Sequence, residues 1–208
     1  MTNTKINSPF YTVENFISPA NCQYLIDKFG ATNPTVKSHT LPLDHEYMAH
    51  ISERLAEHIP AIEAKHQAVA ELPVDGQFKQ YRENPTTPCE MHGCANAKLL
   101  RRKWLKTKDY DLVGYVWLKD FNNGVPLDAG YEVYGGKLEF PIYNFSLLPQ
   151  RGTLVLFPAG PHFITAISPV LAGSLEQLTF GVKLSRADKS LWLYEPALYP
   201  GDYTNWFD

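Results

Sequence analysis

The pattern of apolar and polar residues predicts a strand and a helix near the start of the chain. Residues 10–17 alternate between apolar and polar side chains, which is typical of a strand. Residues 19–29 instead carry their apolar side chains at helical spacing. Ser18 suits the N-cap of this helix, Pro19 suits its first turn, and Gly30 suits its end.

A second apolar stripe at helical spacing runs from residue 43 to residue 58. It predicts an amphipathic helix that is broken or kinked near Pro60, and residues 31–43 before it are expected to form a loop. Several histidines fall in this region, and their spread along a polar helix surface favours surface residues over a metal site. These are His45, His50, His58 and His66.

From Gly76 onward the pattern changes to short alternating or continuous apolar segments separated by turn residues. Several such segments at near-regular spacing are typical of a β-sandwich or a jelly roll. We therefore expect a mainly β single domain, with residues 1–76 as a supporting helical layer, residues 77–184 as a jelly-roll core, and residues 185–208 as an aromatic tail packed on the body or on a partner. The expected strands are 77–82, 110–119, 135–141, 152–158, 163–167 and 175–184.

Composition and charge exclude several classes of protein. The chain has 208 residues and a net charge of -3, which gives no field that would attract nucleic acid or an anionic membrane. No apolar run is long enough to span a bilayer, and residues 1–6 do not begin a signal peptide. Three cysteines are too few for a secreted disulfide framework, so we expect synthesis in the cytoplasm without secretion.

Four local motifs occur in order across the strand-rich part of the chain. A Tyr-bearing strand at residues 78–82 is followed by Met-His-Gly-Cys at 91–94. The second motif is Val-Gly-Tyr-Val-Trp-Leu-Lys-Asp at 113–120, and the third is Tyr-Gly-Gly-Lys-Leu-Glu-Phe-Pro at 134–141. The fourth is Pro-Gln-Arg-Gly-Thr-Leu-Val-Leu-Phe-Pro at 149–158, with Pro-Val-Leu-Ala-Gly at 169–173.

These motifs resemble those of the iron(II)/2-oxoglutarate-dependent dioxygenases of the prolyl 4-hydroxylase type. The resemblance implies a double-stranded β-helix, a cupin-like jelly roll, packed with N-terminal helices. It also implies two His and one carboxylate as iron ligands, and a basic residue that pairs with the far carboxylate of 2-oxoglutarate. The first His and the carboxylate stand two apart because strand side chains at that spacing share a face.

Three of the four positions that the resemblance assigns to this chemistry hold other residues. His92 fills the first His position, but Cys94 stands at the carboxylate position. Thr165 stands at the second His position, and Leu175 at the basic position. The sequence thus predicts a degenerate metal site in which His92 is the main remaining candidate ligand.

Substitute residues leave the chemistry open. His162 lies three residues before the second His position, on the opposite face of a regular strand, and would need a bulge to act as a ligand. Cys94 would be a soft ligand that favours zinc or copper. Tyr81 is a candidate cofactor-binding residue, and strand parity allows Lys79, Arg82 or Lys137 as a replacement for the basic clamp.

The sequence leaves three functions open. The first is a non-catalytic relative that serves as a structural or protein-binding module, needs no cofactor and has a protein partner or self-assembles; such relatives are common in tailed phages, so the module can belong to a virion or its assembly. The alternative is an active Fe(II)/2-oxoglutarate hydroxylase with an altered metal site. The third is a zinc-binding or small-ligand jelly roll, with Cys89, His92 and Cys94 as local metal ligands.

Overall fold

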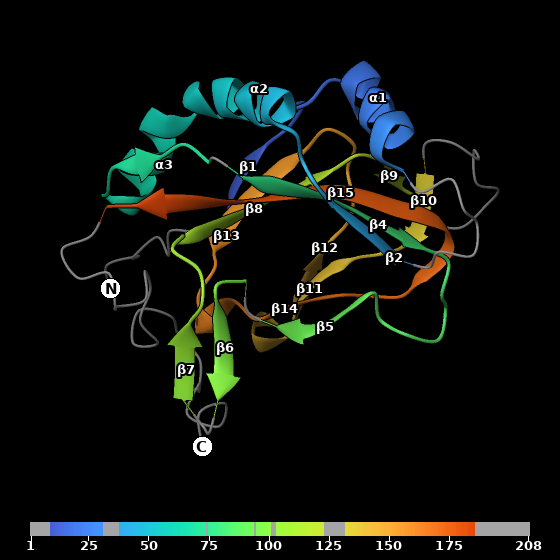
Figure 1. Cartoon of the computed structure of the whole chain (residues 1–208). Helices are drawn as coiled ribbons and strands as arrows, with labels where there is room; N and C mark the ends of the chain where they lie inside the picture. The colour runs from blue at the N-terminus through green and yellow to red at the C-terminus, as the bar shows by residue number, and fades with distance from the viewer. Residues whose placement is uncertain are drawn as a thin grey trace, which may run out of the picture.

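Three helices form a layer over one face of a large sheet (Figure 1). The computed structural model describes residues 9–30, 38–73, 75–93, 95–100, 103–122 and 132–185. Within these ranges the helices are α1 (Pro19–Phe29), α2 (His45–Ala56) and α3 (Ile59–His66). None of the helices in this part of the chain combines the length and the apolar character needed to cross a bilayer.

The helix ends follow the capping residues that the sequence contains. The Ser18 hydroxyl accepts a hydrogen bond from the backbone N–H of Asn21 (3.3 Å), which confirms the helix predicted over residues 19–29. Asp44 caps α2 in the same way, accepting from the backbone N–H of Tyr47 (2.9 Å). The second predicted helix is two helices, and Pro60 lies in the first turn of α3.

The large sheet is built around one long strand. The central strand β15 (Val170–Leu184) pairs antiparallel with β8 (Leu112–Trp117) and with β4 (Gly76–Arg82). Next to β8 lie β13 (Leu154–Pro158) and then β1 (Tyr11–Val13). The other described strands of this sheet are β2 (Ser38–Pro42), β3 (Ala70–Glu71), β9 (Asp120–Phe121) and β10 (Glu132–Gly135).

A smaller sheet faces the large one across the interior of the molecule (Figure 1). Its strand order is β12 (Phe145–Leu147), β11 (Leu138–Phe140), β14 (Thr165–Ile167) and β5 (Glu90–Gly93), all antiparallel. The chain repeatedly crosses from one sheet to the other, as from β4 to β5 and back to β8. This topology is the predicted double-stranded β-helix.

Two glycines bring the chain from the large sheet to the small one. Gly135 and Gly136 have φ angles of 89° and 64°, values that residues with a Cβ rarely adopt. They end β10, and the strand after them points Leu138 and Phe140 into the interior. The Gly-Gly-x-Leu-x-Phe motif is therefore a turn followed by two buried side chains.

Each of the six strand segments predicted after residue 76 overlaps an observed strand. Several short strands were not predicted, among them β3, β5 and β12 and the elements described next. The predicted loop at 31–43 is wrong at its end, because β2 pairs with β4 along its whole length. The hairpin of β6 (Ala97–Leu100) and β7 (Lys103–Lys106), which projects from the body in Figure 1, was not predicted either, since each strand has only four residues and neither shows a longer alternating pattern.

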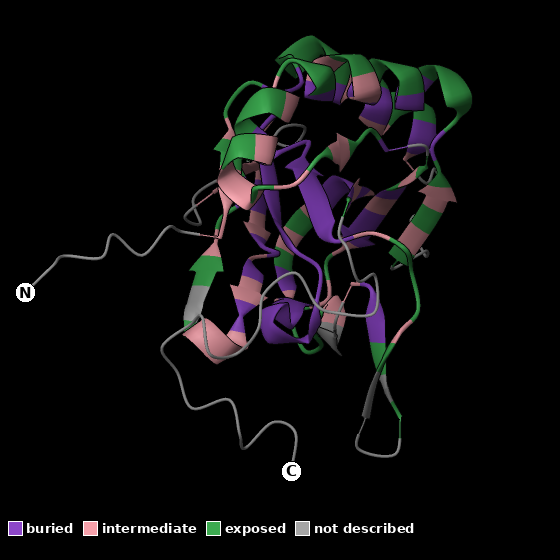
Figure 2. Cartoon of the chain, turned by 90° about the vertical axis from the view of Figure 1, so that its left-hand side faces the viewer, coloured by how far each residue is buried: buried purple, intermediate pink, exposed green. Residues whose placement is uncertain are grey.

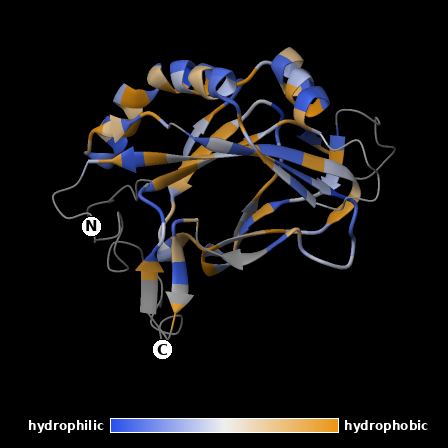
Figure 3. Cartoon of the chain, viewed as in Figure 1, coloured by the Kyte–Doolittle hydropathy of each residue, from blue (hydrophilic) through white to orange (hydrophobic). Residues whose placement is uncertain are grey.

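The two faces of the large sheet cover two separate apolar cores. The helix-side core lies under the helices and contains Leu25, Ile51 and Leu55 from the helices with Phe78, Leu112 and Leu178 from the sheet. The barrel core lies between the two sheets and contains, among others, Tyr81, Tyr115, Phe140, Phe157 and Leu175. Figure 2 shows buried residues along the central strands, and Figure 3 shows that the helices are mixed in hydropathy, with polar positions beside apolar ones.

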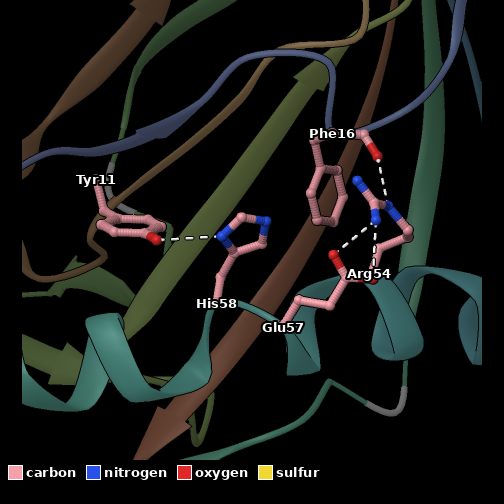
Figure 4. Close-up of polar contacts among 5 residues, drawn as sticks. All are labelled: Tyr11, Phe16, Arg54, Glu57 and His58. Atoms are coloured by element: carbon pink, nitrogen blue, oxygen red, sulfur yellow. Dashed lines mark hydrogen bonds and ion pairs between the residues drawn. The ribbon is translucent and has the colours of Figure 1, made fainter.

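Polar contacts join the helices to the first strand and the turn after it (Figure 4). The Tyr11 hydroxyl lies 3.2 Å from Nδ1 of His58. Arg54 donates from Nε to the backbone oxygen of Phe16 (3.2 Å) and forms an ion pair with Glu57. Of the four histidines expected on the helix surface, His45 and His50 are exposed, while His58 and His66 are half-buried.

The predicted aromatic tail at 185–208 lies outside the described residues apart from Ser185. Its packing on the body or on a partner therefore stays a prediction.

Candidate functional site

The open end of the barrel contains a cavity of about 890 Å³. Its walls come from both sheets, because β4, β8 and β15 contribute one side and β5 and β14 the other. The polar side chains that line it include Lys79, Glu90, Tyr115, Thr165 and Lys183. A polar cavity above an apolar barrel core is the arrangement expected of a ligand site in this architecture.

Glu90, which lines the cavity, is contacted by two side chains of β4. The Lys79 ammonium lies 2.6 Å from Oε1 of Glu90, and the Tyr81 hydroxyl donates a hydrogen bond to the same oxygen. The side chains of Lys79 and Glu90 are 18% and 28% exposed, so the ion pair is partly shielded from water. The other oxygen, Oε2, makes no hydrogen bond or ion pair with a described residue.

Strand alternation explains how this cluster forms. Lys79 and Tyr81 are two apart on β4, so both point into the barrel. Phe78, the residue just before Lys79, points to the opposite face and packs on the helix side. Glu90 is the first residue of β5 in the small sheet and meets them across the interior.

Two tyrosines in the barrel keep their protons. Burial, then the charge of Glu90 and its hydrogen bond, raise the pKa of Tyr81. Burial also raises the pKa of Tyr115, with smaller contributions from Glu90 and Tyr110, against a hydrogen bond with Thr165 that lowers it. Both hydroxyls are therefore neutral at any physiological pH, and Tyr115 is one of the residues that line the cavity.

The structure brings together the strands that carry the two predicted His positions of the metal site, His92 and Thr165. His92 is the third residue of β5, and the next residue, Gly93, pairs with Thr165 of β14. The register shifts between Thr165 and Ile167, because Ile167 pairs with Glu90. The side chain of His92 and the whole of Cys94 lie outside the described residues, so their roles as metal ligands stay predictions.

The predicted basic position is fully apolar. Leu175 is completely buried in the barrel core and pairs with Tyr81 in the large sheet. Gln177 lies two residues after Leu175 on β15 and on the same face of the sheet. It pairs with Lys79 of β4 on one side and with Trp117 of β8 on the other. Within the described part of the chain, neither amide atom of Gln177 nor Nε1 of Trp117 has a hydrogen-bond partner, although both side chains are buried.

The substitute ligands proposed from the sequence lie in different surroundings. His162 is buried in a short 3-10 helix (Pro161–Phe163) before β14, and it is not among the residues that line the cavity. Burial raises the pKa of the Cys89 thiol, which disfavours the thiolate that zinc binding requires. Of the basic residues allowed by parity, Lys79 lines the cavity.

Among the described residues no group of three or more His, Cys, Asp or Glu side chains is close enough to hold a metal ion. The donor chemistry of β5 fits two ligands of a divalent cation, the Glu90 carboxylate and the His92 imidazole, two positions apart in the same strand. Sequence reasoning missed Glu90 because the family motif places the carboxylate after the histidine. The signal available in the sequence was the Glu-x-His spacing of residues 90–92, in a segment for which no strand was predicted.

The fold is that of the prolyl 4-hydroxylase-like Fe(II)/2-oxoglutarate oxygenases, as the motifs implied. No protein-family model matches the chain, and no curated protein sequence does. Three solved structures illustrate the likeness. The viral collagen prolyl hydroxylase vCPH from Paramecium bursaria Chlorella virus-1, in complex with 2-oxoglutarate, is 18% identical, with a TM-score of 0.61 over 86% of this chain and 97% of its own.

The other two structures are more distant in sequence. HygX from Streptomyces hygroscopicus, solved with nickel and 2-oxoglutarate, is 8% identical, with a TM-score of 0.53 over 88% of this chain and 87% of its own. A prolyl hydroxylase from Trichoplax adhaerens, in complex with a hypoxia inducible factor peptide, is 12% identical, with a TM-score of 0.52 over 84% of this chain and 83% of its own.

These structures correct the prediction that no cofactor is used. That prediction rested on the replaced positions at Cys94, Thr165 and Leu175. The same fold holds 2-oxoglutarate in vCPH and HygX, and nickel in HygX. The physical reason for the error is that charged groups enter the cavity from positions outside the motif, Lys79 on β4 and Glu90 on β5.

Proposed function

We propose that this protein is an Fe(II)/2-oxoglutarate-dependent oxygenase of the prolyl-hydroxylase type with an altered metal site. The observation that carries the proposal is the pairing of β5 with β14 beside the cavity, with Glu90 and Thr165 both in its wall. In this arrangement His92 and Glu90 supply an imidazole and a carboxylate from one strand. Thr165 leaves a further coordination position to water or to substrate.

The residues around the cavity have separate roles in this proposal. Iron, when bound, supplies the activation of oxygen. Tyr81 orients the Glu90 carboxylate through its hydrogen bond to Oε1. Tyr115 stays neutral, so it can donate a hydrogen bond to an oxygen of a bound ligand without adding charge. The apolar barrel core below, with Phe140, Phe157 and Leu175, excludes water from the inner end of the cavity.

A polypeptide is the substrate class that we favour. The cavity is open toward solvent and reaches along the rim past Pro42, Leu72 and Pro73, which suits an extended chain better than an enclosed small molecule. The names of two of the similar structures indicate polypeptide substrates. These are the viral collagen prolyl hydroxylase and the Trichoplax prolyl hydroxylase in complex with a hypoxia inducible factor peptide.

The second candidate is a protein-binding module that uses the same rim for a partner and has lost the reaction. The specific observation in its favour is that Thr165 and Leu175 stand where the family has a metal ligand and a cation, and Leu175 is fully buried. Under this candidate the cavity mouth still binds a polypeptide, but no oxygen chemistry follows.

Succinate formation separates the two candidates. Purified protein with Fe(II), ascorbate and 2-oxoglutarate is expected to produce succinate and to bind about one metal ion per chain. His92→Ala and Glu90→Ala should each abolish turnover and weaken metal binding at least tenfold. His50→Ala, a histidine exposed on α2, is the matched control and should change neither. Equal turnover in the wild type and His92→Ala would refute the enzyme assignment, and an absence of metal binding would favour the binding module.

A further inference from the structure

The ion pair between Lys79 and Glu90 places opposite charges inside a cavity that is otherwise suited to ligands. Their charged atoms are 2.6 Å apart, and both side chains are mostly shielded from solvent. Lys79 has no other hydrogen bond or ion pair with a described residue. Each charge is therefore balanced mainly by the other.

The ion pair of Lys79 with Glu90 opposes the binding of a single charged ligand. A cation that approaches Oε2 of Glu90 also approaches the Lys79 ammonium on Oε1, and the two positive charges repel. A carboxylate that approaches Lys79 meets the negative charge of Glu90 in the same way. Removing either partner alone from the pair leaves a partly buried charge uncompensated, which is costly.

We propose that Lys79 and Glu90 exchange partners on ligand binding, so that a divalent cation and a carboxylate ligand bind the cavity cooperatively. The cation takes Glu90, and the carboxylate takes the released Lys79. In the filled cavity each protein charge again has an opposite charge beside it. The inference rests on the proposed function, because it assigns the cation to Glu90 and the carboxylate to the oxidised co-substrate.

Lys79 is better placed for this exchange than the other cations of the cavity. Lys183 is held by Asp109 (3.0 Å) and Glu71 (3.6 Å) at the rim, so its charge is balanced by two acids that are not needed for metal binding. Lys108 lies over the ring of Tyr110 and is exposed. The position from which the family supplies its cation is the apolar Leu175.

Calorimetric titration of the full chain tests the coupling without reference to turnover. Mn(II) serves as the metal, and glutarate serves as a dicarboxylate that lacks the 2-oxo group and so cannot chelate the metal through it. Saturating glutarate is expected to tighten Mn(II) binding by roughly tenfold in the wild type, within the usual range of coupling between two ligands. In Lys79→Met the effect of glutarate should vanish, and Mn(II) alone should bind more tightly than it does to the wild type.

Two further variants complete the experiment. Lys183→Met removes the same charge from the same cavity and should keep the coupling, which makes it the matched control. Glu90→Gln frees Lys79, so glutarate should bind several-fold more tightly without metal than it does to the wild type. Thermal melts of all three variants report whether each is folded.

The outcomes distinguish this inference from the function on which it rests. Mn(II) binding that is indifferent to glutarate, or coupling that survives in Lys79→Met, overturns the exchange and leaves the oxygenase assignment standing. Failure of the wild type to bind Mn(II), even with 2-oxoglutarate present, overturns both.

Discussion

The two faces of the large sheet are made by alternate residues of the same strands, yet they differ in kind. On the helix side, Phe78, Leu112 and Leu178 pack into a continuous apolar core with the helices. On the barrel side, the next residues along include Lys79 and Gln177, and the facing strand adds Glu90. On the helix side, the described polar groups include the buried ion pair of Lys119 with Glu176 (3.0 Å), and Gln80 donates to the same carboxylate.

The contrast shows how one sheet separates stability from ligand binding. The helix-side core removes large apolar side chains from water, which is the main favourable contribution to folding. The barrel side keeps charged and unpaired polar groups near a cavity, and such groups cost free energy in the absence of a ligand. The neighbours Phe78 and Lys79 summarise the difference, since they are consecutive residues on opposite faces.

The largest expected effect is the loss of a side chain from the helix-side core. Phe78→Ala should lower the free energy of unfolding by about 3–5 kcal/mol, because Phe78 is fully buried. Urea denaturation measures the change, and Tyr24→Ala, at a site 52% exposed on α1, is the control with a much smaller loss. Folded Phe78→Ala should still show the coupling of Mn(II) with glutarate. Loss of that coupling would break the comparison between the faces.

A substitution on the barrel side of the sheet is expected to make the protein more stable than the wild type. Gln177→Met keeps the shape of a buried side chain and removes an amide that has no partner within the described residues, so unfolding should cost about 1–2 kcal/mol more. Gln80→Met is the counterpart on the helix side, where the amide donates to Glu176 (2.7 Å), and it should destabilise. The same sign of change in both variants would contradict the contrast.

The smallest expected effect is a pH dependence on the helix side. Burial, with the charge of Lys65, lowers the pKa of His66 to about 4. Between about pH 6.5 and pH 4 the unfolded chain therefore binds a proton at His66 that the folded protein does not. This contribution to stability is complete above about pH 6.5 and is lost as the pH falls toward 4.

The amount is on the order of 1 kcal/mol, since His66 is only half-buried. The pH dependence of the urea midpoint in wild type and His66→Gln measures it. A variant that loses stability as steeply as the wild type over this range would refute the assignment to His66.

Much of the fold could be predicted because the relevant signals are local. The helix over residues 19–29 follows from its cap and its apolar spacing, and the strand that became β8 follows from a run of apolar residues. β2 escaped prediction because its stability comes from hydrogen bonds to β4, and no local pattern reports that pairing. For the site, the motif led to His92, Thr165 and Leu175, but it led away from Glu90.

The sequence by itself determined the jelly-roll class, the helical layer and the long strands β4, β8, β13 and β15, because alternation, capping and turn residues act over a few positions. Only the tertiary structure decided that Lys79 and Tyr81 both contact Glu90, and that Lys79 and Glu90 line one cavity. These residues come from strands in different sheets, and their contact depends on which face of its strand each side chain takes. A charge pair of this kind is a property of two strands brought together, and neither strand contains the information alone.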